Sequence, residues 1–251
     1  MKTKSIFRAT GRCFAAGAGL AAASYAAYVG LAWVRYGEVG SAPHPEDEDR
    51  ELDRFMPSYE IVERHRIRVQ APASLTFAAA TDLNLQQSPL VRGIFRGREW
   101  IMRSDPAPQS VAGSVIEQMR AIGWGMLAEV PGREIVMGAV TQPWVANVVF
   151  RPLAPDEFVA FHDPDYVKIA WTLRADPVGH DESVFRTETR AIATDPSARA
   201  KFRRYWSFVS PGIIVVRWAL LGPVKADAER RARDATPGFG RSDSEEERRY
   251  D

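Results

Sequence analysis

The chain has 251 residues, of which 45% are apolar and 26% are charged, and its formal net charge is +1. This composition is ordinary for a globular protein with one good-sized domain plus appendages, and the charge gives no global attraction to nucleic acid, so we expect no nucleic-acid partner. The single cysteine, Cys13, excludes an intrachain disulfide, a zinc-finger type of metal cluster and Rieske-type iron ligation.

A long uncharged segment follows the basic amino-terminal flank at 1–12. No charged side chain occurs from Cys13 to Val34, and a helix of that length spans roughly 33 Å, enough for the core of a bilayer. The sequence therefore predicts a transmembrane or signal-anchor helix at 13–35. The basic flank favours a single-pass membrane protein with a cytoplasmic amino terminus, and the side of the globular domain stays open, with the extracytoplasmic side slightly favoured.

Two alternatives to a signal anchor stay open. Ala21-Ala22-Ala23 could serve as the cleavage site of a signal peptide, although the apolar run continues past that point to Trp33. The segment is also only weakly hydrophobic, because twelve of the 22 residues from Cys13 to Val34 are Ala or Gly. A core helix of a soluble protein is therefore the other alternative.

An acidic stretch at 36–56 contains Pro43 and Pro45 and is expected to be a linker to a domain at 57–235. Tyr59–Gln70 then alternates as a first strand. One face of this strand carries Ile61, Glu63, His65, Ile67 and Val69. Ala71-Pro72 breaks the strand, and a short helix follows to about Leu83.

The middle of the chain is expected to form a second short helix from Ser88-Pro89 and a further short helix or irregular connection near 115–122. Strands should then alternate with turns such as Pro131-Gly132. They are expected at Gly125–Val130, Glu134–Val140, Val145–Pro152, Glu157–His162, Tyr166–Asp176 and Ser183–Ala193. The last two alternate apolar and charged residues, which is typical of a half-buried antiparallel sheet.

A long helix should begin at Asp195-Pro196, because Asp is a good cap and Pro suits the first helical position. Apolar residues recur along it at three- and four-residue steps as far as Val224. Pro211-Gly212 lies in its middle and should kink it. The tail at 236–251 is rich in Gly, Ser and Glu and is expected to be disordered.

Two stretches resemble a known superfamily. Ile67 to Phe77 reads I-R-V-Q-A-P-A-S-L-T-F, similar to the "I-x-V-x-A-P-x-x-x-V-F" opening of SRPBCC domains, and Phe185–Arg190 leads into Asp195–Arg199 in a similar way. The superfamily includes START lipid-transfer domains and polyketide cyclases. The resemblance covers Pro57 to Arg233 and implies the α+β helix-grip fold, a curved antiparallel sheet wrapped on a long carboxy-terminal helix with an apolar cavity between them. The amino-terminal transmembrane helix would precede this domain.

The candidate site residues follow from that cavity. Its expected ligand-binding wall is Met137, Trp171, Phe185, Phe202, Trp206 and Val209, all of which could equally be core. His65 and Glu63 are weak catalytic candidates, as a general base facing the cavity. No nucleophile elbow, phosphate-binding loop or dinucleotide fingerprint is present. The run His162–Asp165 is typical of a turn rather than a metal site, so we expect neither a metal nor a cofactor.

Three functions remain open at this point. The first is a membrane-anchored helix-grip domain that binds a hydrophobic small molecule or lipid without chemistry. The second is an enzyme of the polyketide cyclase or isomerase kind, with His65 or Glu63 as its base. The third is a structural or assembly factor whose core is filled. The basic cluster Arg199–Arg204 is typical of a solvated helix face, and contact with anionic lipid headgroups is the alternative.

Overall fold

The computed structural model describes residues 3–38, 48–84, 88–103 and 113–235. A six-stranded antiparallel sheet runs in the order β1-β6-β5-β3-β2, and β4 pairs with β3. The strands are β1 Ile61–Val69, β2 Gly125–Val130, β3 Glu134–Thr141, β4 Phe150–Arg151, β5 Val167–Pro177 and β6 Ser183–Ala193. The helices are α1 Thr3–Val34, α2 Arg50–Phe55, α3 Ala73–Thr81, α4 Pro89–Met102, α5 Val115–Ala121, α6 Pro155–Ala160 and α7 Pro196–Ala235.

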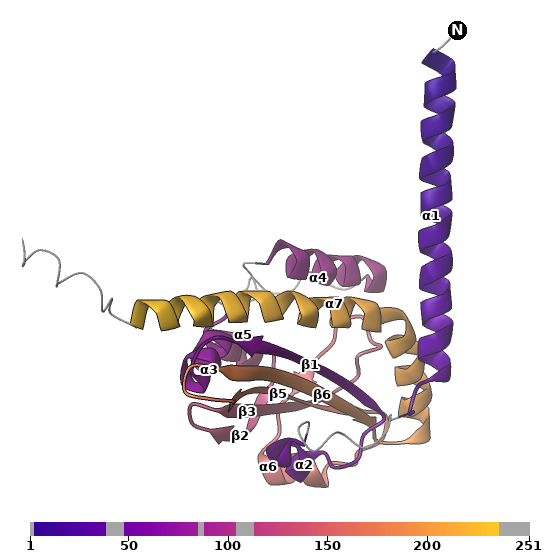
Figure 1. Ribbon diagram of the computed structural model, residues 1–251. Coiled ribbons are helices and arrows are strands. Elements are labelled where there is room, and N and C mark those ends of the chain that lie inside the picture. Colours follow the sequence, from indigo (N-terminus) through magenta and orange to yellow (C-terminus); the bar gives the residue numbers. More distant parts are fainter. Residues whose placement is uncertain (1–2, 39–47, 85–87, 104–112, 236–251) are drawn as a thin grey trace, which may run out of the picture.

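The sheet separates two layers of helices (Figure 1). Its concave face carries α3 and α7, and its outer face carries α2 and α6 at one end. In β1 the predicted inward face is confirmed, since Ile61 and Val69 are buried in the clusters that also hold side chains of α7. The helix-grip arrangement expected from the sequence is therefore present.

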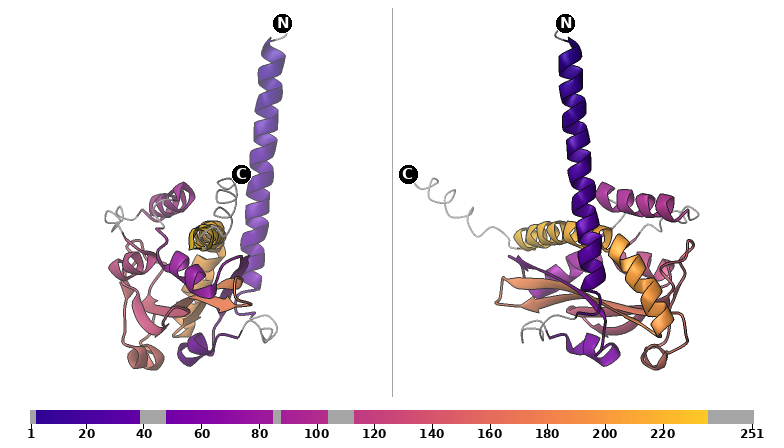
Figure 2. Two further views of the ribbon diagram at one scale, coloured as in Figure 1. Left: turned by 60° about the vertical axis from the view of Figure 1, so that its left-hand side comes forward. Right: turned by 90° about the vertical axis from the view of Figure 1, so that its right-hand side faces the viewer.

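α7 begins as predicted and is bent. The carboxylate of Asp195 accepts hydrogen bonds from the backbone N–H groups of Ser197 and Ala198. The helix continues through Pro211 and Pro223 to Ala235, and its first and second halves run in different directions (Figure 2). Among the described residues, α7 is the helix long and apolar enough to cross a membrane, and Gly19–Val34 is a shorter apolar stretch.

α1 packs against the first half of α7 by its carboxy-terminal end. The hydroxyl of Tyr25 donates to the carbonyl of Phe208, and the hydroxyls of Tyr28 and Ser210 lie 3.1 Å apart. The amino-terminal part of α1 extends away from the domain (Figure 1). The predicted helix is thus present, and its crossing of a membrane stays a prediction.

Two sequence expectations for the outer face were wrong. Glu157–His162 is not a strand, because Pro155 opens α6 and the Glu157 carboxylate accepts from the backbone N–H of Ala154. Buried Phe158 is the contact of this short helix with the sheet, and six residues are too few for a period-two pattern to exclude a helical turn. The expected strand Val145–Pro152 is reduced to the two paired residues of β4.

The stretch 36–56, expected to be a linker, also differs at its end. Residues 50–55 form α2, capped by Asp49, whose carboxylate accepts from the backbone N–H of Leu52. Leu52 and Met56 are buried against the outer face of the sheet. The expected disordered tail at 236–251 lies outside the described residues.

Candidate functional site

A polar cluster lies on the concave face, beneath the second half of α7. Strand alternation places Glu63 and His65 of β1 opposite Thr189 and Thr187 of β6, respectively. Arg217 reaches this floor from α7, and its Nη1 atom donates to the hydroxyl of Thr187 at 3.2 Å. We call these five residues the concave polar cluster.

The contacts within this cluster are sparse. The Nε2 atom of His65 lies 3.8 Å from the Oε2 atom of Glu63, which is an ion-pair distance but too long for a hydrogen bond. Trp218 of α7 meets the His65 ring edge to face, with 6.1 Å between ring centroids. The His65 side chain is 7% exposed, so the imidazole lies inside the molecule with an aromatic side chain beside it.

Burial shifts the protonation of all three titratable groups of the cluster. Desolvation, together with the charge of Arg217, lowers the pKa of His65 from its ordinary value. Desolvation raises the pKa of Glu63 although Arg217 opposes it, and it lowers the pKa of Arg217 to about 10. His65 is therefore a neutral imidazole near pH 7, and Arg217 remains a cation there.

Three buried atoms of the cluster have no hydrogen-bond partner among the described residues. They are His65 Nε2, Thr189 Oγ1 and Arg217 Nε. Buried polar atoms in native proteins are paired in roughly 90% of cases or more, because an unpaired one costs about 1–3 kcal/mol. These atoms come from β1, β6 and α7, and each is able to donate to, or accept from, a polar group placed beside it.

Arg217 was missed by the sequence reasoning, although a signal for it exists. It is the only charged residue between Arg204 and Lys225, in the middle of the apolar run of α7. A single arginine in such a run has to bury its charge or reach past its neighbours to water. Here it points to the floor of the sheet and contacts Thr187.

Five of the six expected wall residues lie in three separate packed clusters. Met137 and Trp171 pack with Trp124, and Phe185 packs with Leu221 of α7. Phe202 and Trp206 pack with Tyr36 at the end of α1. Val209 is partly buried and belongs to none of these sets. The structure therefore brings Met137 together with Trp171, and Phe202 together with Trp206, but it does not gather all six around one point.

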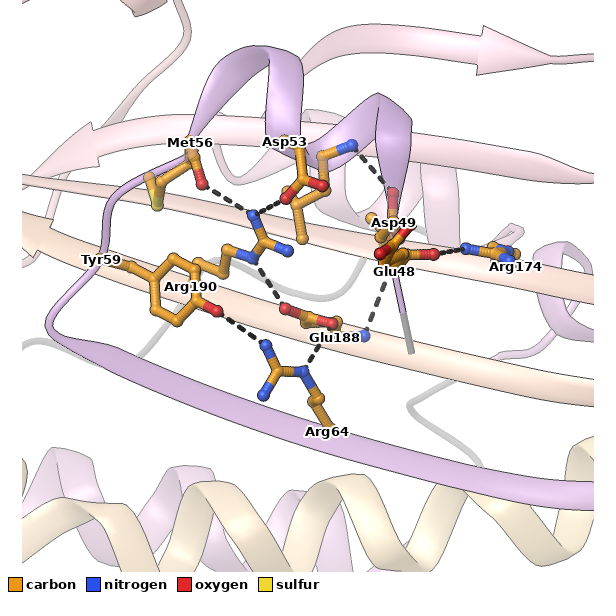
Figure 3. Close-up of polar contacts among 11 residues, drawn as sticks. Glu48, Asp49, Asp53, Met56, Tyr59, Arg64, Arg174, Glu188 and Arg190 are labelled. Carbon is orange, nitrogen blue, oxygen red and sulfur yellow. Dashed lines mark hydrogen bonds and ion pairs between the residues drawn. The ribbon is translucent and has the colours of Figure 1, made fainter. Parts of the chain in front are cut away.

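A second buried polar network lies on the outer face, under α2. Arg190 is 1% exposed and donates to the carboxylates of Glu188 and Asp53 and to the carbonyl of Met56 (Figure 3). Arg64 donates to the second oxygen of Glu188. The alternation of β6 predicts that Glu188 and Arg190 lie on the face opposite its apolar residues. In the structure, α2 covers this face and buries both side chains.

A hollow of about 250 Å³ adjoins this network. Its wall consists of Asp49, Arg64, Arg66, Thr172, Arg174, Arg186 and Glu188, together with His65 and Thr187 of the concave polar cluster. Arg174 and Arg186 both bind the carboxylate of Asp176, and Arg64 binds Glu188. These three arginines therefore share two carboxylates, and each of them has an acidic partner within the protein.

Glu134 and Asp49 form an acidic pair on the same outer face, beside α2. Burial and the neighbouring Asp49 carboxylate raise the pKa of Glu134 to about 8, while Arg174 and Arg133 oppose the shift. One proton shared between two close carboxyl groups is the physical result. No group of three or more potential metal ligands occurs within the described ranges, and His162 is exposed beside the turn at Asp163–Asp165.

Comparisons with known proteins give neither a matching family model nor a matching curated protein. Among solved structures, an aromatase/cyclase from Streptomyces sp. R1128 is 14% identical, with a TM-score of 0.30 over 71% of this chain and 99% of that one. A START superfamily protein from Mycobacterium smegmatis is 12% identical (TM-score 0.25, 70% and 99%). Norcoclaurine synthase from Thalictrum flavum is also 12% identical (TM-score 0.29, 79% and 100%).

These similarities concern fold alone, and no ligand or activity is transferred from them. The chain's own strand order and the long helix on its concave face are the stronger ground. On that ground, the part of the chain from β1 to α7 has a helix-grip fold, in which an antiparallel sheet carries a long carboxy-terminal helix on its concave face.

Proposed function

We propose that the protein is a membrane-anchored helix-grip domain that binds an amphiphilic small molecule or lipid between its sheet and α7. The apolar part of the ligand would lie against the aromatic side chains of the concave face. Its polar end would lie at the concave polar cluster. The observation that carries the proposal is the group of three buried, unpartnered atoms on His65, Thr189 and Arg217.

The chemistry of the cluster favours a ligand with an anionic or strongly polar end. Arg217 is a cation with one hydroxyl partner, and no carboxylate lies within ion-pair distance of it among the described residues. A carboxylate or phosphate group would supply the acceptors that a guanidinium needs. Neutral His65 and the hydroxyl of Thr189 could complete its hydrogen bonds. Burial of apolar ligand area would add about 25 cal/mol per Å² before ordering costs.

Membrane anchoring is supported by α1. The uncharged run from Cys13 to Val34 falls within this helix, which extends away from the domain. The basic residues before the run favour a cytoplasmic amino terminus. An anchored domain of this kind would exchange its ligand with the bilayer or with a partner at the membrane surface.

A second candidate function is catalysis of the cyclase or isomerase kind. The neutral imidazole of His65, with its free Nε2 atom beside Glu63, is the observation that favours it. A general base needs a proton acceptor of this type inside the pocket. His65→Gln separates the two functions, because a binding protein would retain the same ligand. An enzyme with the same substitution would accumulate a species of different mass or chromatographic retention.

Native mass spectrometry of the purified full-length chain in lipid nanodiscs tests the binding proposal. The wild-type chain should retain a small molecule, and Thr189→Val should reduce its occupancy by several-fold because the ligand loses a hydroxyl partner. Thr172→Val is the matched control, since Thr172 is buried on the outer face of the same sheet and accepts from the backbone N–H of Glu188. Equal occupancy in both variants, or no retained molecule in the wild type, would contradict the proposal.

A further inference from the structure

α7 exposes large apolar side chains along one of its sides, from its first half into its second half. Phe208, Val215 and Trp218 are all exposed and are spaced by seven and three residues, which places them on one side of the helix. The opposite side of α7 buries Trp206, Leu221 and Val224 in the core. Only 17% of the most apolar stretch of α7 is buried inside the protein, so much of this stretch has no cover among the residues that the structure describes.

α4 extends the same outer side. It lies on the side of α7 that faces away from the sheet (Figures 1 and 2). A Cβ atom at Gly212 would lie 3.2 Å from the Cγ2 atom of Ile94, so glycine permits this close contact. Trp100 of α4 is 82% exposed. Arg92 and Arg96 are exposed as well, so the helix presents both an aromatic side chain and positive charge.

The direction of α1 indicates what lies against the outer side of α4 and α7. Its amino-terminal part leaves the domain on the side of α4 and α7 and extends beyond both of them (Figures 1 and 2). α2 and α6 lie on the opposite side of the sheet. A bilayer entered by α1 would therefore lie next to α4 and α7 and away from α2 and α6.

We propose that Trp100 of α4 and Phe208, Val215 and Trp218 of α7, here called the α4–α7 face, rest in the interfacial layer of the bilayer that α1 enters. This inference rests on the proposed anchoring and names the surface that the domain contacts. Tryptophan is enriched at that depth, and the arginines of α4 suit anionic headgroups. A helix that exposes apolar and basic side chains together is typical of interfacial binding.

The same placement of the α4–α7 face would give the ligand a route between the bilayer and the concave polar cluster. Trp218 belongs to the α4–α7 face and also contacts the ring of His65. Movement of Trp218 would connect the concave polar cluster with the bilayer interface. A lipid or other amphiphile could then pass between membrane and cluster without crossing bulk water.

Depth-dependent fluorescence quenching in liposomes of phosphatidylcholine and phosphatidylglycerol tests the inference on the full-length chain. Cys13→Ser would be combined with single cysteines at Leu20, Trp100, Val215 or Val159, each labelled with an environment-sensitive fluorophore. Val159 of α6 is the matched control, because it is 50% exposed against 44% for Val215 and lies on the opposite side of the sheet. Labels at 100 and 215 should be quenched several-fold more by spin-labelled lipid than the label at 159, which aqueous iodide should quench.

The four positions separate the two proposals. If the label at 20 is quenched by lipid but the labels at 100 and 215 behave like the one at 159, the anchoring stands and the α4–α7 face does not touch the membrane. If the label at 20 is quenched by iodide alone, the anchoring fails, and lipid quenching at 100 and 215 would still support the face. Lipid quenching at 20, 100 and 215 with iodide quenching at 159 supports both.

Discussion

Each face of the sheet carries one inward-pointing arginine, Arg190 buried and Arg217 partly buried, and the two differ in how fully they are paired. On the outer face, Arg190 has two carboxylates and a carbonyl as partners. On the concave face, Arg217 has one hydroxyl, and its Nε atom has no partner among the described residues. A fully paired buried charge holds neighbouring elements together, whereas an under-paired one is able to receive something else. The comparison separates a structural network from a candidate site.

The partners of Arg190 explain what the outer network does. Asp53 and Met56 come from α2 and its end, and Glu188 comes from the strand beneath. The arginine therefore joins α2 to the sheet across more than a hundred residues of sequence. At Arg217, the contacts that the described residues make between α7 and the floor are the hydrogen bond to Thr187 and the neighbouring ring contact of Trp218 with His65. This part of α7 is held mainly by apolar packing on either side of the cluster.

The largest expected change in the free energy of unfolding comes from a substitution that breaks the outer network. Arg190→Met would leave the buried carboxylate of Glu188 with Arg64 alone, and loss of one partner of a buried pair costs about 3–5 kcal/mol. Arg217→Met is the matched change on the concave face and should alter the free energy of unfolding by about 1 kcal/mol or less, because little pairing is lost. Urea denaturation of both variants measures the difference. Equal losses would show that Arg217 is as structural as Arg190.

The acidic pair beside α2 should give the outer face a pH dependence. The pKa of Glu134 is raised to about 8 in the folded protein, so between pH 5 and pH 8 the native state holds a proton that the unfolded chain has lost. Stability from this group is therefore present at low pH and falls as the pH rises toward about 8. Glu134→Gln should flatten this slope in denaturation curves from pH 5 to pH 9. An unchanged slope in the variant would exclude Glu134 as its source.

A smaller change in stability, this time a gain, is expected from a substitution on the concave face. Thr189→Val removes a buried hydroxyl that has no partner and keeps the shape of the side chain, so the ligand-free protein should gain about 0.5–1 kcal/mol. Thr172→Val removes a hydroxyl that accepts a backbone hydrogen bond and should lose a similar amount. Thermal unfolding of delipidated samples gives both values. A loss in Thr189→Val would mean that its hydroxyl is bonded in the folded protein.

The smallest effect concerns the titration of His65. Burial and the charge of Arg217 both lower its pKa, so its ring protons should titrate below the ordinary value near 6.5 in NMR spectra. Arg217→Met removes one of the two causes and should raise the pKa of His65. A His65 pKa that is unaffected by Arg217→Met would place the two side chains too far apart for one site.

Local patterns were sufficient to predict much of the concave face. The period of two in β1 placed Glu63 and His65 inward, and Asp195-Pro196 marked the start of α7. Both features depend on residues close in sequence, which is why one chain reveals them. Strand alternation could not show that the charged face of β6 is buried, because that depends on α2, whose Asp53 is 137 residues away from Arg190. The acidic residues around α2 hid three buried apolar residues in and directly after this helix, Leu52, Phe55 and Met56.

The candidate site was predicted in part. His65 and Glu63 were expected to face a cavity, and the structure places them on the concave floor. Their partner Arg217 was overlooked because the apolar residues around it dominated the pattern. The six aromatic and aliphatic positions share no single cluster because the sheet is wide, and α7 meets it at several places along its length.

The central claim is that the concave polar cluster receives the polar end of a ligand. An experimental structure of the full-length chain in lipid nanodiscs tests it most directly. The account predicts a bound molecule with a polar atom within hydrogen-bond distance of His65 Nε2 and of the Arg217 guanidinium, and with its apolar part between the sheet and α7. A closed cluster, in which Arg217 binds Glu63 directly and side chains fill the remaining space, would contradict it.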